Sequence, residues 1–189
     1  VVWIPNGADM ADFPPLPAPA GGDGMTLMYL GSLGQANGME AIVQAMARVK
    51  AAGGTGIRLR IIGSGPRREA LEEMARSLGV TDCVLFEAPV PKSQVPALAA
   101  QADAFVVNLL DLPLYRFGIS LNKLFDYMAA ARPVVFAGNP VNNPVRDSGA
   151  GFCVPADDAD AMAQAILGLA ALSPTERQAL GEAGRRHVQ

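Results

Sequence analysis

The sequence predicts a doubly wound α/β protein with a mostly parallel, six-stranded sheet. Two observations support this fold class. Short runs rich in Val, Ile and Leu show no polar alternation, which is typical of strands buried on both faces. Between these runs lie segments whose apolar residues recur at helical spacing. The 189 residues, half of them hydrophobic, suffice for one Rossmann-like domain of this kind.

The predicted elements alternate along the chain between turn residues. The expected strands are residues 27–30, 57–62, 83–86, 104–108, 133–137 and 151–154. The expected helices are residues 39–50, 68–78, 94–101, 121–131 and 159–172, with a last helix after Ser173. Ser173 can cap that helix, Pro174 fits its first position, and Glu176 can complete a capping box.

Residues 1–24 are predicted to be an interdomain linker, and residues 25–189 the domain itself. Four prolines lie between Phe13 and Pro19, and glycines follow at positions 21, 22 and 24, a composition that resists helix and sheet. The chain starts without an initiator Met, and a helical pattern still runs at Gln189. We therefore expect an excised part of a longer polypeptide.

Composition disfavours several classes of function. The net charge is −3 and basic residues are scattered, so nucleic acid is not an expected partner. No apolar run reaches the roughly 20 residues that a membrane-spanning helix needs. Cys83 and Cys153 lie far apart, as expected of two buried thiols in the reducing cytoplasm. His187 is the single histidine and is expected to be exposed, so a histidine metal site or a Ser-His-Asp triad is not expected.

Ligands of such sheets bind in the loops that follow the strands. The loop 31–38 holds Gly31, Ser32, Gly34 and Asn37, and its glycines let backbone N–H groups approach an anion. It lacks the G-x-G-x-x-G pattern, and the next strand ends at Gly63 without an acid for ribose, which disfavours a dehydrogenase. A tight turn without ligand, and a plain connection at Gly63, remain alternatives.

The segment 118–129 is the most informative. Ser120 is predicted to cap a helix, leaving the amides of Leu121 and Asn122 for a phosphate, with Lys123 as an added positive charge. Asp126 follows on a face that can accept ribose hydroxyl protons. This combination suits a nucleoside diphosphate. The alternative is an ordinary amphipathic helix on which Lys123 and Asp126 form a surface pair.

Six motifs, in order along nearly the whole chain, resemble the C-terminal domain of retaining GT-B glycosyltransferases, a group that includes sugar transferases of lipopolysaccharide and capsule assembly. The motifs are Ile4-Pro5-Asn6-Gly7-Ala8-Asp9 with Phe13, Tyr29-Leu30-Gly31, Ile62-Gly63-Ser64-Gly65-Pro66, Val84-Leu85-Phe86 through Val90, Asp126-Tyr127-Met128-Ala129 with Arg132-Pro133-Val134-Val135, and Gly149 to Pro155. Within that group, the segment from Ser120 to Ala129 is similar to enzymes that place amino- or deoxy-sugars in surface polysaccharides.

The resemblance implies a donor site for a nucleoside diphosphate sugar, with a UDP-sugar expected. It assigns Asp126 to the ribose, Val90 to the loop beside the base, and the backbone around Gly118, Ile119, Ser120 and Leu121 to the diphosphate. It also implies transfer with retained anomeric configuration, no cofactor and no metal. The partners implied are the donor and an N-terminal acceptor-binding domain of the same polypeptide, which can lie at the inner face of a membrane.

Three positions depart from the family pattern. Ser32 stands where many members have arginine, and Asn37 where many have lysine, so two usual phosphate cations are missing. Lys123 offers one replacement. The family has an acid eight residues before the ribose-binding acid, and here that residue is Gly118. The catalytic residues are therefore unknown, and Asp111 and Arg116 are the charged groups of the same loop that can approach the sugar.

The predicted function is thus donor binding within a glycosyltransferase of surface polysaccharide or lipopolysaccharide synthesis. The isolated domain is expected to bind donor weakly and to transfer nothing at a useful rate. The alternatives are an inactive nucleotide-binding or interaction module and an enzyme like a nucleotide-sugar epimerase.

Overall fold

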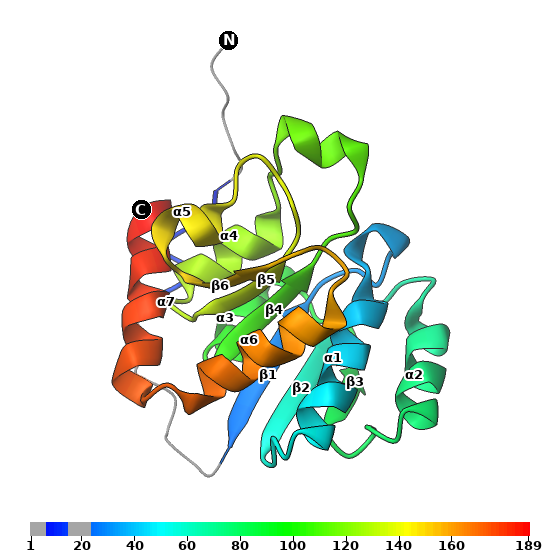
Figure 1. Ribbon diagram of the computed structural model, residues 1–189. Helices are drawn as coiled ribbons and strands as arrows, with labels where there is room; N and C mark the ends of the chain where they lie inside the picture. The colour runs from blue at the N-terminus through cyan, green and yellow to red at the C-terminus, as the bar shows by residue number, and fades with distance from the viewer. Residues whose placement is uncertain (1–6, 15–23) are drawn as a thin grey trace.

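The computed structural model describes residues 7–14 and 24–189 (Figure 1). Its centre is a six-stranded sheet with the strand order β3-β2-β1-β4-β5-β6. All neighbouring strands are parallel. The strands are β1 (Met25–Leu30), β2 (Ile57–Ile62), β3 (Val84–Glu87), β4 (Ala104–Asn108), β5 (Val134–Ala137) and β6 (Gly151–Val154). The predicted fold class is confirmed, and the sheet is wholly parallel.

Helices cover both faces of the sheet (Figure 1). One face carries α1 (Met39–Ala51), α2 (Arg68–Ser77) and α6 (Ala159–Ala171). The other face carries α3 (Val95–Ala99), α4 (Asn122–Ala129), α5 (Pro144–Ser148) and α7 (Pro174–Val188). Three short 3-10 helices lie in loops, η1 (Gln35–Asn37), η2 (Lys92–Gln94) and η3 (Pro113–Phe117).

Alternate residues of the central strands feed two separate hydrophobic cores. On β1, Leu27 and Tyr29 belong to the core under α1 and α6, while Met28 and Leu30 belong to the core under α3 and α4. All four are at most 6% exposed. Burial on both faces explains why β1 shows no regular polar alternation.

The strand order fixes where a ligand can bind. The chain first moves outward from β1 to β3 and then returns to place β4 on the other side of β1. The loops that leave β1 and β4 therefore diverge, which opens a crevice at the carboxyl ends of these strands. The β4–α4 loop, which holds η3, projects from the sheet above its neighbours (Figure 1).

Tyr127 fastens α4 to the end of β1. Its hydroxyl donates to the carbonyl of Leu30 at 2.9 Å and accepts from the amide of Leu30 at 2.7 Å. Its ring stacks on Phe105 of β4 with 3.9 Å between the ring centroids. Because a buried backbone group without a partner is costly, this side chain holds α4 in one position against the sheet.

Two details of α4 differ from the prediction. The helix begins at Asn122 with Leu121 in the N-cap position, so Ser120 lies one residue before the cap. The helix ends at Ala129, two residues early, because Ala131 adopts a left-handed conformation with φ of 53°. Ala131 occupies the glycine position of the family motif, and glycine adopts that conformation without steric cost.

The structure also adds α5, which the sequence analysis missed. Five residues are too few to show helical periodicity, but Asn143 caps the helix by accepting from the amides of Val145 and Arg146.

The structure also bears on the expectations for three single residues. The Ser173 capping box is present and His187 is exposed, as predicted. Cys153 is exposed rather than buried, because it lies on the edge strand β6.

The linker prediction is mostly outside the described residues, which exclude residues 1–6 and 15–23. In the described part, Phe13 is 3% exposed and packs in the core under α3 and α4. The family motif at Ile4, Pro5 and Asn6 lies outside it. The division into linker and domain stays a prediction.

Substituting Gly181 of α7 by alanine should destabilise the fold. An added Cβ would lie 2.1 Å from the carbonyl oxygen of Ala131, which is a backbone atom and cannot swing away. We expect Gly181→Ala to lower the free energy of unfolding by about 2 kcal/mol, as overpacking usually does. The matched control is Gly168→Ala in α6, where the nearest atom is 3.8 Å away and alanine should add about 0.5–1 kcal/mol. Urea unfolding of both variants measures the difference; equal effects would contradict the proposed α7 contact.

Candidate functional site

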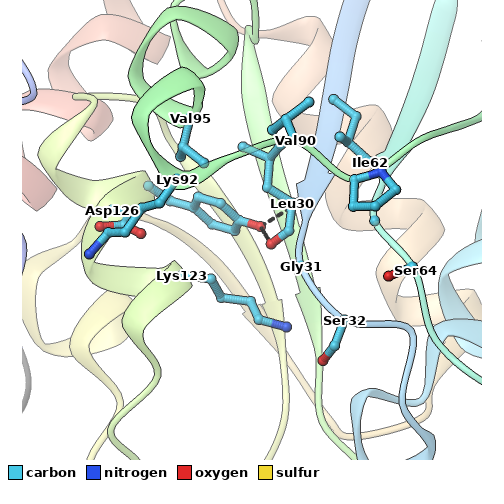
Figure 2. Close-up of a pocket in the computed structure, with 13 residues that line it drawn as sticks. Leu30, Gly31, Ser32, Ile62, Ser64, Val90, Lys92, Val95, Lys123 and Asp126 are labelled. Atoms are coloured by element: carbon cyan, nitrogen blue, oxygen red, sulfur yellow. Dashed lines mark hydrogen bonds between the residues drawn. The ribbon is translucent and has the colours of Figure 1, made fainter.

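A cavity of about 330 Å³ opens at the carboxyl ends of β1 and β2, on the side of α3 and α4 (Figure 2). Its lining combines apolar side chains, two lysines and one carboxylate. The lining residues are Leu30, Gly31, Ser32, Ile62, Gly63, Ser64, Pro89, Val90, Lys92, Val95, Lys123, Asp126 and Tyr127. Six predicted site residues meet here, namely Gly31, Ser32, Gly63, Val90, Lys123 and Asp126.

Close backbone contact brings the first two loops together. A Cβ on Gly63 would lie 1.8 Å from the carbonyl oxygen of Gly31, so only glycine fits after β2. Arg68 strengthens the same edge by donating to the carbonyls of Gly63 and Glu87, at 2.9 and 2.7 Å. The loops after β1, β2 and β3 therefore form one continuous wall of the cavity.

Lys123 reaches across from α4 to the end of β1. Its Nζ donates to the hydroxyl of Tyr29 at 2.6 Å and to Oδ1 of Asn37 at 2.9 Å. Burial lowers the pKa of Lys123 to about 8. The surface pair with Asp126, which was the alternative to a ligand site, does not form, because Lys123 extends toward Ser32 while Asp126 lies at the opposite side of the cavity (Figure 2).

Asp126 is half-buried beside the apolar wall formed by Val90 and Val95. Burial raises the pKa of Asp126, the positive charge of Lys92 opposes this shift, and the carboxylate of Asp12 adds to it. Lys92 begins η2 in the connection between β3 and α3, which also holds Val90. The cavity thus has one lysine at each side and a carboxylate next to the second.

The other predicted residues lie outside the cavity lining. Asn37 contributes indirectly through Lys123, and Gly34 begins η1 behind it. Gly118, Ile119, Ser120 and Leu121 precede α4. The amide of Ile119 is not open to a phosphate, since it donates to Oδ1 of Asn142 at 2.6 Å. The assignment of Ile119 to the diphosphate therefore stays a prediction, and its amide has a polar partner from a distant loop.

The two charged candidates near the transferred sugar are also outside the cavity lining. Asp111 accepts from Asn139 at 3.2 Å, and the guanidinium of Arg116 lies 4.7 Å from the ring centroid of Phe117. Both side chains belong to the projecting loop between β4 and α4. No catalytic residue is assigned.

A buried polar network behind the cavity was missed by the sequence analysis. Asn108, at the end of β4, donates to the carbonyl of Gly38 and to Asp157, both at 2.9 Å, and accepts from the amide of Asp157. It joins the loops that precede α1 and α6 to the centre of the sheet. The one sequence feature that marks it is an asparagine closing an apolar strand.

Within residues 7–14 and 24–189, no group of three or more His, Cys, Asp or Glu side chains could hold a metal ion. No helix in these ranges is both long and apolar enough to cross a membrane. The expected independence from metals and cofactors stays a prediction.

A parallel sheet with a charged cavity at the carboxyl ends of its strands is the arrangement in which doubly wound α/β domains bind their ligands. Comparison with known proteins gives the family. Residues 24–171 match the model of the group 1 glycosyl transferases, and the chain belongs to this family. The predicted membership in the GT-B glycosyltransferases is thereby confirmed.

Three known proteins illustrate the relationship. The chain is 30% identical over 96% of its length to a GDP-mannose-dependent phosphatidylinositol monomannoside mannosyltransferase of Mycolicibacterium smegmatis, covering 50% of that protein. It is 30% identical over 76% of its length to a lipopolysaccharide core biosynthesis glycosyltransferase of Rhizobium meliloti, covering 39% of it. Among solved structures, sucrose-phosphate synthase of Thermosynechococcus elongatus superposes with a TM-score of 0.78 at 26% identity, over 97% of this chain and 46% of that one. The chain thus spans about half the length of such relatives.

Two carboxylates, Asp126 in the cavity and Glu87 at the end of β3, should affect stability with opposite signs. Because burial raises the pKa of Asp126, the folded chain disfavours its ionised form, and Asp126→Asn should raise the melting temperature at pH 7. A hydrogen bond from Arg60 lowers the pKa of Glu87, so Glu87→Gln should lower the melting temperature at pH 7.

Both differences should shrink toward pH 3, where these carboxyl groups become protonated. Thermal unfolding followed by circular dichroism at the two pH values measures this. A loss of stability in Asp126→Asn at pH 7 would show that the carboxylate is structural.

Proposed function

We propose that this domain binds the nucleoside diphosphate sugar donor of a retaining glycosyltransferase. The observation that carries the proposal is the grouping of Asp126, Lys123 and the glycine loop around one cavity at the strand ends. Membership of the group 1 glycosyl transferases supports it.

The cavity offers a separate surface for each part of such a donor. Val90, Val95 and Ile62 supply an apolar wall against which a base can lie. Asp126 beside that wall can accept hydrogen bonds from ribose hydroxyls. The glycine loop at Gly31, with the ammonium of Lys123, suits the diphosphate.

The proposed reaction breaks the bond between the anomeric carbon and the diphosphate oxygen, and a hydroxyl oxygen of the acceptor forms the new bond. The proton of that hydroxyl passes to the leaving diphosphate. The diphosphate leaves with the electron pair, so negative charge grows where the positive charge of Lys123 lies. Donors that are fixed in place before the reaction stabilise such charge without reorganising. The acceptor is a glycan or lipid-linked sugar of surface polysaccharide or lipopolysaccharide synthesis. Retention of configuration is inferred from the family resemblance.

We further propose that the acceptor-binding domain belongs to the other half of the polypeptide and covers this end of the sheet. The half-length match to relatives supports this. The exposed side chains of Leu114 and Phe117, on the loop that projects at this end, also support it. A cytoplasmic location is retained as a prediction, in line with the free thiols of Cys83 and Cys153.

One alternative function keeps an observation in its favour. Ser32 and Asn37 stand where many family members carry basic residues, and loss of such residues is expected of an inactive module. An epimerase-like enzyme lacks such support.

Calorimetric titration with UDP, GDP, ADP and NAD tests the donor site. We expect one nucleoside diphosphate to bind, with UDP the sequence-based expectation and GDP suggested by the name of the mannosyltransferase relative. Asp126→Ala should weaken that binding by about 1 kcal/mol or more, or about fivefold, because a hydrogen bond to a charged group is lost.

The control for this titration is Asp82→Ala, an exposed carboxylate paired with Lys50 before β3, which should leave binding unchanged. Binding of NAD alone, or of no nucleotide, would refute the donor-site proposal. Sugar transfer by the full-length parent, abolished when donor binding is abolished, separates a transferase from an inactive module.

A further inference from the structure

The glycine loop that should meet the diphosphate contains no basic residue of its own. Residues 31–38 are Gly, Ser, Leu, Gly, Gln, Ala, Asn and Gly. Even so, a positive charge lies inside this loop, because the Nζ of Lys123 contacts Asn37 at 2.9 Å. A Cβ on Gly31 would lie only 3.1 Å from the same Nζ. The loop therefore receives its cation from α4, which lies 86 residues further along the chain.

The hydrogen bonds of Lys123 within the protein use only part of its donor capacity and do not balance its charge. In the described part of the chain, its ammonium has two hydrogen-bond partners, Tyr29 and Asn37, and both are neutral oxygens. No ion pair joins it to a carboxylate among these residues. An ammonium has three donors, so one remains for a ligand. A buried positive charge without an opposite charge costs free energy, and an anion would remove that cost.

Tyr29 and Asn37 are themselves fixed. The hydroxyl of Tyr29 donates to the carbonyl of Ser32 at 2.7 Å, so its lone pairs face Lys123. The side-chain amide of Asn37 donates to the same carbonyl at 3.1 Å, which turns its own oxygen toward the ammonium. Both residues use their donors on the loop backbone and keep their acceptors for Lys123.

We propose that Lys123 binds the donor diphosphate in place of the missing loop cations, and that Tyr29 and Asn37 are positioning residues that aim it. The inference rests on the proposed function and specifies how its anion site works. It assigns no direct ligand contact to either positioning residue. Asn37 occupies a usual lysine position of the family and here holds a lysine from another element.

This arrangement makes binding depend on a proton. The pKa of Lys123 is about 8, and a bound diphosphate stabilises the charged form. At pH 8 about half of the free molecules lack the proton, so binding should take up about half a proton. Above pH 8 the affinity should fall by up to about tenfold per pH unit. Among the described residues, the other titratable groups facing this region are Tyr29, Lys92, Asp126 and Tyr127. Burial keeps the pKa values of Tyr29 and Tyr127 above this pH range.

Calorimetry at pH 8 in buffers of different ionisation enthalpy measures the protons taken up with UDP, or with whichever nucleoside diphosphate binds best. Nucleoside diphosphates are fully ionised at this pH, so the ligand contributes little. Lys123→Met should weaken binding about tenfold or more and abolish the uptake, because a charged hydrogen bond is lost. Lys50→Met, at an exposed lysine before β2, should change neither quantity.

The pH dependence of UDP affinity distinguishes positioning residues from merely structural ones, because only a positioning residue changes the pKa of Lys123. Tyr29→Phe and Asn37→Ala each remove one acceptor from the ammonium, so the pKa of Lys123 should fall. The pH at which UDP affinity declines should then move below 8 in both variants, while the thermal unfolding midpoint of each variant verifies folding.

Equal affinity in Lys123→Met, no proton uptake, or an unshifted pH profile would overturn the inference while the proposed function stands. If no nucleoside diphosphate binds the wild-type chain, the proposed function fails and the inference fails with it.

Discussion

The two hydrogen bonds between Tyr127 and the backbone of Leu30 hold the candidate site together. At the end of β1 the Leu30 amide and carbonyl find their partner in a helix rather than in a neighbouring strand. Because both groups are buried, α4 cannot slide without leaving them unsatisfied. Lys123 and Asp126 flank Tyr127 on the same helix, so this contact sets where the ammonium and the carboxylate meet the loops of the sheet.

Much of the fold follows from local rules that a sequence exposes. Short runs rich in Val, Ile and Leu predicted all six strands, and parallel pairing follows from the helices between them. What was missed had either too few residues or a distant cause. The helix α5 has five residues, too few for periodicity, and α4 stops early at the left-handed Ala131. No sequence rule predicts an alanine in that conformation, since its steric cost is offset by packing elsewhere.

The candidate site was predictable in its chemistry and only partly in its geometry. Val90 and Gly63 could be placed because motifs tie them to strand ends, and Asp126 because a motif ties it to α4. The backbone amide of Ile119 could not, because its partner Asn142 is 23 residues away. The orientation of the Lys123 side chain could not be predicted either, since helical spacing places Lys123 and Asp126 on the same face. Only the position of Tyr29 and Asn37 decides that the lysine turns toward the loop.

Asn142 binds both polar groups of the Ile119 peptide, accepting from its amide at 2.6 Å and donating to its carbonyl at 2.9 Å. These two hydrogen bonds hold the loop after β4 against the loop after β5, just before α4 begins. A molecule that pushes on one of these loops must displace the other as well.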